Sequence, residues 1–528
     1  MGRVKSRKRE RIIRDAQNVL LCKKHELPIA YEWNLPKILC AISILTILAS
    51  QFWTFFARNG IFIFGLELER ENFHNYSYSN DNVNKTDELT VLVHHPKVDA
   101  VHLQHVRNVF ERFGYKVTDD VNAEWDVLWS HDFPFISMAD ILENLKPHQV
   151  VNKMPGHSYI TLKVNFVTSG ALFIPPAFQF PQDREKFIQF RKENPKSQFL
   201  VKDNRHRSIK LVPSNKINLE SSESFVQEFI PNPLLIDGRK FEFGIFVVVT
   251  SIYPLRLYRI QGDMIIRYSR YPYYPLDANN LSQYVISDDC LQYWESVEMK
   301  KYLKLSFSIQ ESFEATIESV GADPRAVWEQ VDKAIVSSYM AREKYMIFEL
   351  SKYRNYRNFF ELIRFDFFLD DNFNLHALEA NMSPNLSSMK YKQNAIIYEQ
   401  VLQTLFSLVG ISTYLHPPFH KRQDLKDMIV ADRNIMVFPE ICLQCTNCSS
   451  YDCQLCSTCM SQDFALDVKM AYREHLNKFK ARRIFPPKMT QEDARLGIGE
   501  ELARNMSDRS VLLCRWFQGK CLNDETWC

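Results

Sequence analysis

The sequence predicts an α+β protein, and three observations support that prediction. The 528 residues are 46% hydrophobic and 24% charged with only 14 glycines, which excludes disordered, collagen-like and low-complexity proteins. Between about 155 and 395, short runs rich in β-branched and aromatic residues alternate with helical stretches. Nine of the twelve cysteines lie between Cys442 and Cys528, which predicts a Cys-rich C-terminal lobe. At about 150 residues per domain, the length suggests roughly three domains.

A run of twenty residues without a charge, Ile38–Ala57, predicts a membrane anchor. At 1.5 Å per residue, a helix of that length matches a hydrocarbon core of about 30 Å. Residues 1–37 hold ten Lys or Arg against four acids, and this bias places the N-terminus in the cytosol. We therefore expect a single-pass type II membrane protein of the endoplasmic reticulum or Golgi, with a buried core helix as the alternative. The seven Asn-X-Ser/Thr triplets agree with this topology and predict a glycoprotein.

The charge of the whole chain is nearly balanced. Its 65 basic and 63 acidic residues leave a net charge of +2, so we expect no nucleic-acid partner. A local basic stretch, Tyr472–Lys488, contains Arg473, Lys478 and Arg483. It is compatible with a helix that meets an acidic protein tail, and equally with a solvated helix face.

Six cysteines at regular spacing, from Cys442 to Cys459, permit two chemistries. Paired CxxC units can hold a tetrahedral zinc ion through thiolates alone. In an oxidising compartment the same residues form disulfides that hold together a small lobe with little core of its own. Beyond the predicted anchor, ten cysteines remain, an even number that suits pairing. The residues alone leave both alternatives open.

Two predicted strands, 365–370 and 375–381, are joined by the turn at 370–372 and carry side chains with oxygen atoms. Strand alternation sends Asp366, Glu379 and Asn381 to places where they can converge. Two carboxylates and an amide oxygen suit Mg2+, which takes its remaining ligands from water and substrate phosphates. The alternative is a set of ordinary solvated turn residues.

Longer motifs resemble a known family. The segments 227–243 and 250–258 resemble the central signature of the tubulin tyrosine ligase-like family, and 360–371 and 378–386 resemble its metal-binding segment. Residues 125–130 and 154–156 resemble its first conserved region. The resemblance spans about 125–395, in the family's order.

This resemblance implies an ATP-grasp-like fold behind the N-terminal transmembrane helix. It also implies a ligase of the tubulin polyglutamylase group that uses ATP and Mg2+ to add glutamate to a protein carboxylate through an acyl phosphate. Tubulin, or another protein with acidic side chains, is the implied partner. The alternatives are a weakly active or non-catalytic nucleotide-binding member and, leaving the resemblance aside, a Golgi glycosyltransferase. The expected segments are a basic tail (1–37), the anchor region (38–64), an N-terminal lobe (88–190), the ATP-grasp core (191–415) and a Cys-rich helical region (440–528).

The resemblance also implies roles for individual residues. Lys202 and Lys240 are expected to contact ATP, and Arg267 to hold the amino-acid substrate. The hinge that faces adenine is expected at Gln227, Glu228, Phe229 and Ile230. Glu242, where the family usually has Asp, is expected to contact ATP and act in catalysis, and Asp366, Glu379 and Asn381 to hold magnesium.

Two departures from the family pattern bear on activity. The expected phosphate loop, 202–210, contains no glycine, although Arg205, Arg207 and Lys210 can supply charge instead. The arginine expected two residues after Glu242 is Gly244, which cannot hold a carboxylate. Nucleotide binding is therefore better supported than catalysis, and we expect Gly244→Arg to raise turnover if space permits.

Overall fold

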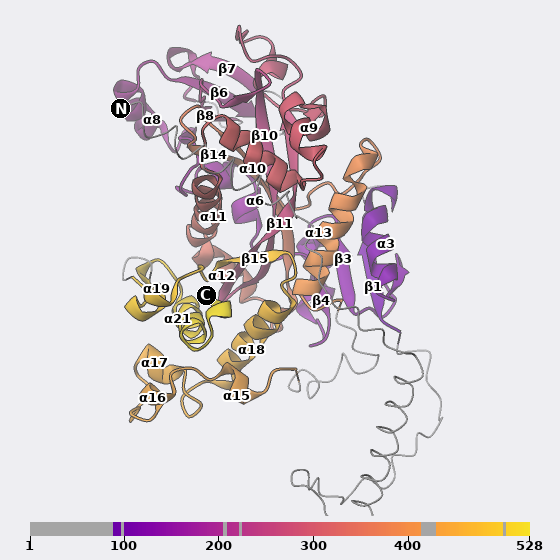
Figure 1. Ribbon diagram of the computed structural model, residues 1–528, viewed down its shortest axis with the longest axis vertical. Helices are drawn as coiled ribbons and strands as arrows, with labels where there is room; N and C mark the ends of the chain where they lie inside the picture. Colours follow the sequence, from indigo (N-terminus) through magenta and orange to yellow (C-terminus); the bar gives the residue numbers. More distant parts are fainter. Residues whose placement is uncertain (1–87, 97–99, 204–208, 221–223, 413–428, 500–502) are drawn as a thin grey trace, which may run out of the picture. The chain divides into compact units, whose positions relative to one another are not determined.

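The computed structural model describes residues 88–96, 100–203, 209–220, 224–412, 429–499 and 503–528. Within these residues the chain forms three β-sheets with helices packed against them, so the predicted mixture of helices and strands is confirmed (Figure 1). The predicted anchor region, 38–64, and the loop residues Arg205 and Arg207 lie outside the described residues. No helix in the described ranges is both long and apolar enough to cross a membrane.

The central sheet is antiparallel, with the order β12-β11-β10-β13-β14. Strand β10 is buried along nearly its whole length because it lies between two neighbours, which explains its continuous apolar sequence. Two short strands extend the sheet, β9 against β10 and β15 against β11. The bounds are β9 Leu235–Ile236, β10 Arg239–Ile252, β11 Leu255–Tyr268, β12 Leu291–Gln292, β13 Glu361–Leu369, β14 Leu375–Asn381 and β15 Ala481–Phe485.

Two smaller four-stranded sheets precede most of the central one in the chain. The first is parallel, with the order β2-β1-β3-β4, and the second is antiparallel, with the order β5-β8-β6-β7. Phenylalanines from α8, β5 and β6 form a separate small core in the second sheet. The bounds are β1 Thr90–His94, β2 Lys116–Thr118, β3 Val127–Ser130, β4 Val150–Val151, β5 Ala177–Gln179, β6 Gln198–Asp203, β7 Ile209–Pro213 and β8 Ser224–Glu228.

Helices cover the sheets and contribute to one large core. Helix α10 packs on β11, α12 on β10, α13 on α3 and β11, and α6 and α7 on β14 (Figure 1). Good capping fixes where several begin: Ser308 and Glu311 form a capping box at α10, and Asp323 caps α11. The bounds are α3 Gln104–Arg112, α4 Pro134–Ser137, α5 Ala139–Glu143, α6 Ser158–Thr161, α7 Lys163–Val167, α8 Arg184–Glu193, α9 Val297–Leu303, α10 Ile309–Ser319, α11 Pro324–Met340, α12 Glu343–Leu350 and α13 Ala395–Leu408.

The C-terminal helices gather around a core of their own, which includes Trp516, Phe517 and Trp527 (Figure 1). The cysteines of this lobe form four disulfides: Cys442–Cys456, Cys445–Cys453, Cys448–Cys459 and Cys521–Cys528. Between the two alternatives for this cluster, the structure therefore has disulfides rather than a thiolate metal site. Of the ten cysteines expected to pair, Cys290 and Cys514 are free and buried. The helices are α15 Asp432–Ile435, α16 Pro439–Cys442, α17 Tyr451–Gln454, α18 Gln462–Asn477, α19 Gln491–Leu496 and α21 Asp508–Asn523.

The basic stretch Tyr472–Lys488 is not a single helix. Helix α18 ends at Asn477 and the chain then forms β15, which pairs with β11. Arg483 is buried, donates to the carbonyl oxygens of Pro486 and Trp527, and lies over the Phe517 ring. This part of the stretch holds the lobe together and is no solvated helix face.

Candidate functional site

One face of the central sheet brings several of the predicted residues together. In the register of β10 and β13, Gly244 lies opposite Asp366, and in that of β13 and β14, Asp366 lies opposite Glu379. Glu242 lies opposite Arg267 on β11. Because side chains alternate along a strand, these residues share one face with their neighbours two positions away.

The three expected magnesium ligands are close to one another. Asn381 Nδ2 donates to Asp366 Oδ2 at 3.2 Å and to Glu379 Oε1 at 3.3 Å. Among the described residues, no group of three or more His, Cys, Asp or Glu side chains is arranged to hold a metal ion. Two carboxylates and an amide nevertheless fit Mg2+ bound with a nucleotide, since the phosphates and water supply its other ligands. Asp366, Glu379 and Asn381 are thus the residues that would hold the ion.

Cations surround these carboxylates, and two of them were not predicted. Arg364, on β13, donates from Nε to Asp366 Oδ1 at 2.7 Å and from Nη2 to Oδ2 at 2.8 Å. Lys163, at the start of α7, lies 3.0 Å from Glu379 Oε2. Arg267 Nη2 lies 3.2 Å from Asp366 Oδ2. Although burial alone would raise the pKa of Glu379, Lys163 and Arg364 bring it below its usual value, so this carboxylate is ionised.

Glu242 lies at the edge of the same cluster. Lys240 Nζ is 3.4 Å from Glu242 Oε1 and also donates to the Tyr284 carbonyl at 2.9 Å. Arg267 Nη2 is 3.8 Å from Glu242 Oε2. Burial raises the pKa of Glu242 in spite of Lys240 and Arg267, and the charges of Asp366 and Glu379 raise it further. A ligand cation placed here would keep this side chain ionised.

Lys202 is held by a neighbour from the predicted hinge. Its Nζ donates to Gln227 Oε1 at 2.7 Å, and Gln227 Nε2 donates to the Pro175 carbonyl at 3.3 Å. Burial lowers the pKa of Lys202 to about 8, and the charges of Lys163 and Lys240 contribute to this. Lys202 therefore loses its positive charge as the pH rises through about 8, which is within the range in which enzymes work.

The remaining hinge residues have local partners. The Glu228 carboxylate accepts from the Ser197 hydroxyl at 2.7 Å, and the amides of Glu228 and Phe229 donate to the Pro176 and Gln198 carbonyls. Phe229 packs edge-on against Tyr284. Ile230 is the second residue after β8 and is half-buried. The hinge thus lies at the end of β8, and the amides of Glu228 and Phe229 are already used within the protein.

The side chains of Asp366 and Arg364 fill the space beside Gly244. A Cβ atom at this position would lie 2.7 Å from Asp366 Oδ1 and 2.8 Å from Arg364 Cδ. The expectation that Gly244→Arg raises turnover stays a prediction, and it requires the Arg364 side chain to move away from position 244.

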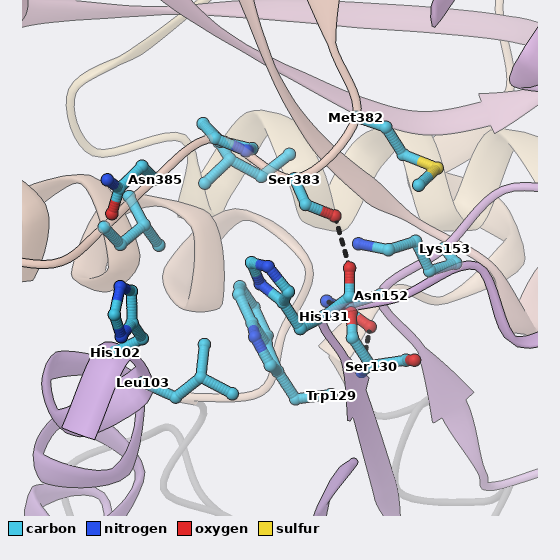
Figure 2. Close-up of a pocket in the computed structure, with 13 residues that line it drawn as sticks. His102, Leu103, Trp129, Ser130, His131, Asn152, Lys153, Met382, Ser383 and Asn385 are labelled. Atoms are coloured by element: carbon cyan, nitrogen blue, oxygen red, sulfur yellow. Dashed lines mark hydrogen bonds between the residues drawn. The ribbon is translucent and has the colours of Figure 1, made fainter. Parts of the chain in front are cut away.

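A cavity of about 400 Å3 adjoins the cluster (Figure 2). It is lined by Met382, Ser383 and Asn385, which directly follow β14, and by Leu362, which lies two residues from Arg364 on the same face of β13. The Ser383 hydroxyl donates to the His131 carbonyl at 2.5 Å, which joins this segment to the end of β3 (Figure 2). The sequence motifs beginning at Leu378 and Trp125 thus meet in one place.

The lining of this basic cavity includes Lys153 and His131. Lys153 is only 3% exposed, and Figure 2 shows its amine extending into the cavity between Ser383 and Asn152. Burial lowers the pKa of Lys153, although Glu361 and Asp132 oppose this. Burial, followed by the charge of Lys153, also lowers the pKa of His131. An anionic ligand in the cavity would favour the charged form of both groups.

Comparison with known proteins decides the family. A family described as "Tubulin-tyrosine ligase family" matches residues 141–423, which include every predicted site residue. The chain belongs to this family. It is 37% identical over 446 residues to a protein of Caenorhabditis elegans named "Probable tubulin polyglutamylase ttll-15", covering 81% of the chain and 84% of that relative.

More distant relatives of the same family are longer. The human "Tubulin monoglutamylase TTLL4" is 24% identical over 60% of this chain, and the match covers 27% of that protein. The human "Tubulin polyglutamylase TTLL7" is 24% identical over 58% of the chain, covering 37% of its length. The chain therefore corresponds to only part of these two relatives, while it matches most of the nematode protein.

The predicted localisation is wrong. A single-pass type II membrane protein of the endoplasmic reticulum or Golgi was expected, but the relatives are named for the modification of tubulin. The predicted span itself, 38–57, lies outside the described residues. The expected membrane partner and glycoprotein character, which depended on that topology, are therefore unsupported.

Proposed function

We propose that this chain is an ATP- and Mg2+-dependent ligase with an ATP-grasp-like fold that adds glutamate to a carboxylate of an acidic protein. One observation carries the proposal. Two carboxylates and an amide on adjacent strands converge within hydrogen-bond distance, with Lys163, Arg267 and Arg364 directly against them. A site of this kind gathers phosphates, a metal ion and a carboxylate, which is what activation of a carboxylate by ATP requires.

The nucleotide is proposed to lie beside Lys202, on β6, and Lys240, on β10. Their amines would neutralise phosphate oxygens, and the chain at 227–230 would flank the adenine ring. Mg2+, held by Asp366, Glu379 and Asn381, would offset charge on the transferring phosphoryl group. Glu242, beside Lys240, would orient that lysine toward the phosphates.

The proposed reaction has two steps. An oxygen of the acceptor carboxylate attacks the γ-phosphorus of ATP, so that an acyl phosphate forms and ADP leaves. The amine of the incoming glutamate then attacks the acyl carbon, an amide bond forms, and phosphate and a proton are released. Arg267 would hold a carboxylate of the incoming glutamate, and the position of its guanidinium beside the same cluster supports this role.

The basic cavity supports an acidic substrate. It adjoins the cluster at the end of β14, and Lys153 and His131 can bind a carboxylate there. The names of the relatives make tubulin the first acceptor to test.

The experiment incubates the purified chain with tubulin, glutamate, ATP and Mg2+, and detects glutamyl additions by mass spectrometry. The proposal predicts additions that require both ATP and Mg2+. Metal-dependent ATP binding without any addition, on tubulin or on acidic peptides, would instead favour the non-catalytic alternative.

A further inference from the structure

The positive charge missing at Gly244 is present nearby. The family pattern expects an arginine two residues after Glu242, on the strand that faces Asp366. In this chain that position is glycine. The adjacent strand, β13, carries Arg364 two residues before Asp366, and alternation places Arg364 on the same face as Asp366.

The Arg364 side chain lies directly over Gly244. A Cβ built at position 244 would be 2.8 Å from Arg364 Cδ and 3.0 Å from Arg364 Nε. Carbon atoms that are not bonded do not approach so closely, and ordinary contacts lie near 3.5–4.0 Å. The conformation of Arg364 therefore requires glycine at 244, and the two positions are coupled through space.

We propose that Arg364 takes over the catalytic position of the arginine that is absent at 244, so that its guanidinium contacts the phosphoryl group and the acceptor carboxylate as the acyl phosphate forms. This inference rests on the proposed function. The guanidinium reaches the same site from the neighbouring strand. It fits there because Gly244 has no side chain.

The orientation of the guanidinium suits this role. Its Nε and Nη2 atoms are directed at the two oxygens of Asp366, which fixes the plane of the group. Nη1 donates to no protein group among the described residues, and the side chain is 13% exposed. One edge of the fork is thus held by the protein while the other remains for a ligand. A lysine could not divide its contacts in this way, because its ammonium is a single point charge.

Arg364 also lies between the predicted magnesium ligands and the basic cavity. On β13, Asp366 is one of the predicted magnesium ligands and Leu362 lines the basic cavity. Arg364 lies between them on the same face. Its backbone lies opposite Asn381 on β14. A group at this point can contact both the phosphoryl donor and a carboxylate in the cavity.

The first test replaces the charge. Arg364→Gln is compared with Arg515→Gln, which removes an arginine from an ion pair with Asp452 in the C-terminal lobe. Removal of one preorganised electrostatic group typically lowers kcat by roughly 10²–10³-fold. We expect that loss for Arg364→Gln, with KM for ATP within about threefold, and no loss of kcat for Arg515→Gln. Thermal melts establish that both variants are folded.

The second test exchanges the two residues. Gly244→Ala should lower kcat because its methyl group displaces Arg364, whereas Gly499→Ala, where a Cβ meets nothing within 4 Å, should not. Gly244→Arg alone should be at least as impaired as Gly244→Ala. The double variant Gly244→Arg/Arg364→Gly returns the charge to the family position, and we expect its kcat to exceed that of Arg364→Gly by at least tenfold.

A further measurement does not depend on turnover. The affinity for ADP, aluminium fluoride and Mg2+, which together imitate the transferring phosphoryl group, should fall in Arg364→Gln by a larger factor than the affinity for ADP and Mg2+. An active wild type with an equally active, folded Arg364→Gln variant overturns the role of Arg364 and leaves the proposed function intact. A wild type that adds no glutamate refutes the proposed function, and equal aluminium fluoride affinities in that case overturn the role of Arg364 as well.

Discussion

Glu379→Gln is the most direct perturbation of the predicted metal ligands. Glu379 has one carboxylate oxygen 3.0 Å from Lys163 and the other 3.3 Å from Asn381, and its pKa is held below the usual value. The amide keeps the shape of the side chain and removes one negative charge opposite the ion. A hydrogen bond or contact to a charged group is worth about 1.5–3 kcal/mol, so we expect ATP affinity in the presence of Mg2+ to fall roughly tenfold to a hundredfold.

The sign of the effect without metal distinguishes this mechanism from simple damage. Without Mg2+, removal of a negative charge near the phosphates should leave ATP affinity unchanged or improve it. Isothermal titration calorimetry with and without Mg2+ measures both affinities, and Glu298→Gln, which alters a surface pair with Lys301, is the matched control. Equal magnesium dependence in the wild type and in Glu379→Gln would remove this residue from the metal site.

Three further predictions concern other parts of the molecule. Because the pKa of Lys202 is lowered to about 8, ATP affinity should fall roughly tenfold between pH 7 and pH 9 as this lysine loses its proton, and a Lys202→Gln variant should lack that component. Lys153→Met should raise KM for the acidic acceptor about tenfold, the effect of one charge-assisted contact, with ATP affinity unchanged in calorimetry. Glu474→Ala should lower the free energy of unfolding in urea by roughly 3–5 kcal/mol, because buried Arg256, 3.0 Å from that carboxylate, is left unpaired; a change below 1 kcal/mol would refute this account of the lobe contact.

Local patterns predicted much of the sheet. The strand expected at 375–381 has those bounds in the structure, and the apolar run from Phe241 is the buried strand β10. In both cases the signal was local: alternation in one, continuous burial in the other. The convergence of Asp366, Glu379 and Asn381 also followed from a short turn between adjacent strands, which leaves little freedom in register.

The residues that sequence reasoning missed depend on long-range packing. Lys163 reaches Glu379 from a helix more than two hundred positions away in the chain. The significance of Arg364 depends on the register between β10 and β13, which brings Gly244 next to it. The sequence pattern of either strand alone does not specify that register. A glycine where the family expects arginine was a visible signal, and a search of neighbouring strands for an unexplained arginine would have found its partner.

The basic stretch after Tyr472 shows the same limit. Its charges suggested an exposed helix, but pairing with β11 and burial of Arg483 against Phe517 place half of it inside the lobe. Tertiary contacts of this kind override local charge patterns. The disulfides likewise could not be chosen over zinc from spacing alone. The CxxC spacing suits a zinc site, but the same thiols can also pair with cysteines farther along the chain, as they do here at separations of 7, 8, 11 and 14 residues.

The central claim, that a protein carboxylate is activated as an acyl phosphate, has one direct measurement. An acidic acceptor labelled with ¹⁸O in its side-chain carboxylates is incubated with the chain, glutamate, ATP and Mg2+, and the released phosphate is analysed by mass spectrometry. The proposed chemistry transfers one acceptor oxygen to phosphate for each amide bond formed, so ¹⁸O should enter phosphate in equal amount to the glutamate added. Glutamate addition that leaves the phosphate unlabelled would contradict the mechanism.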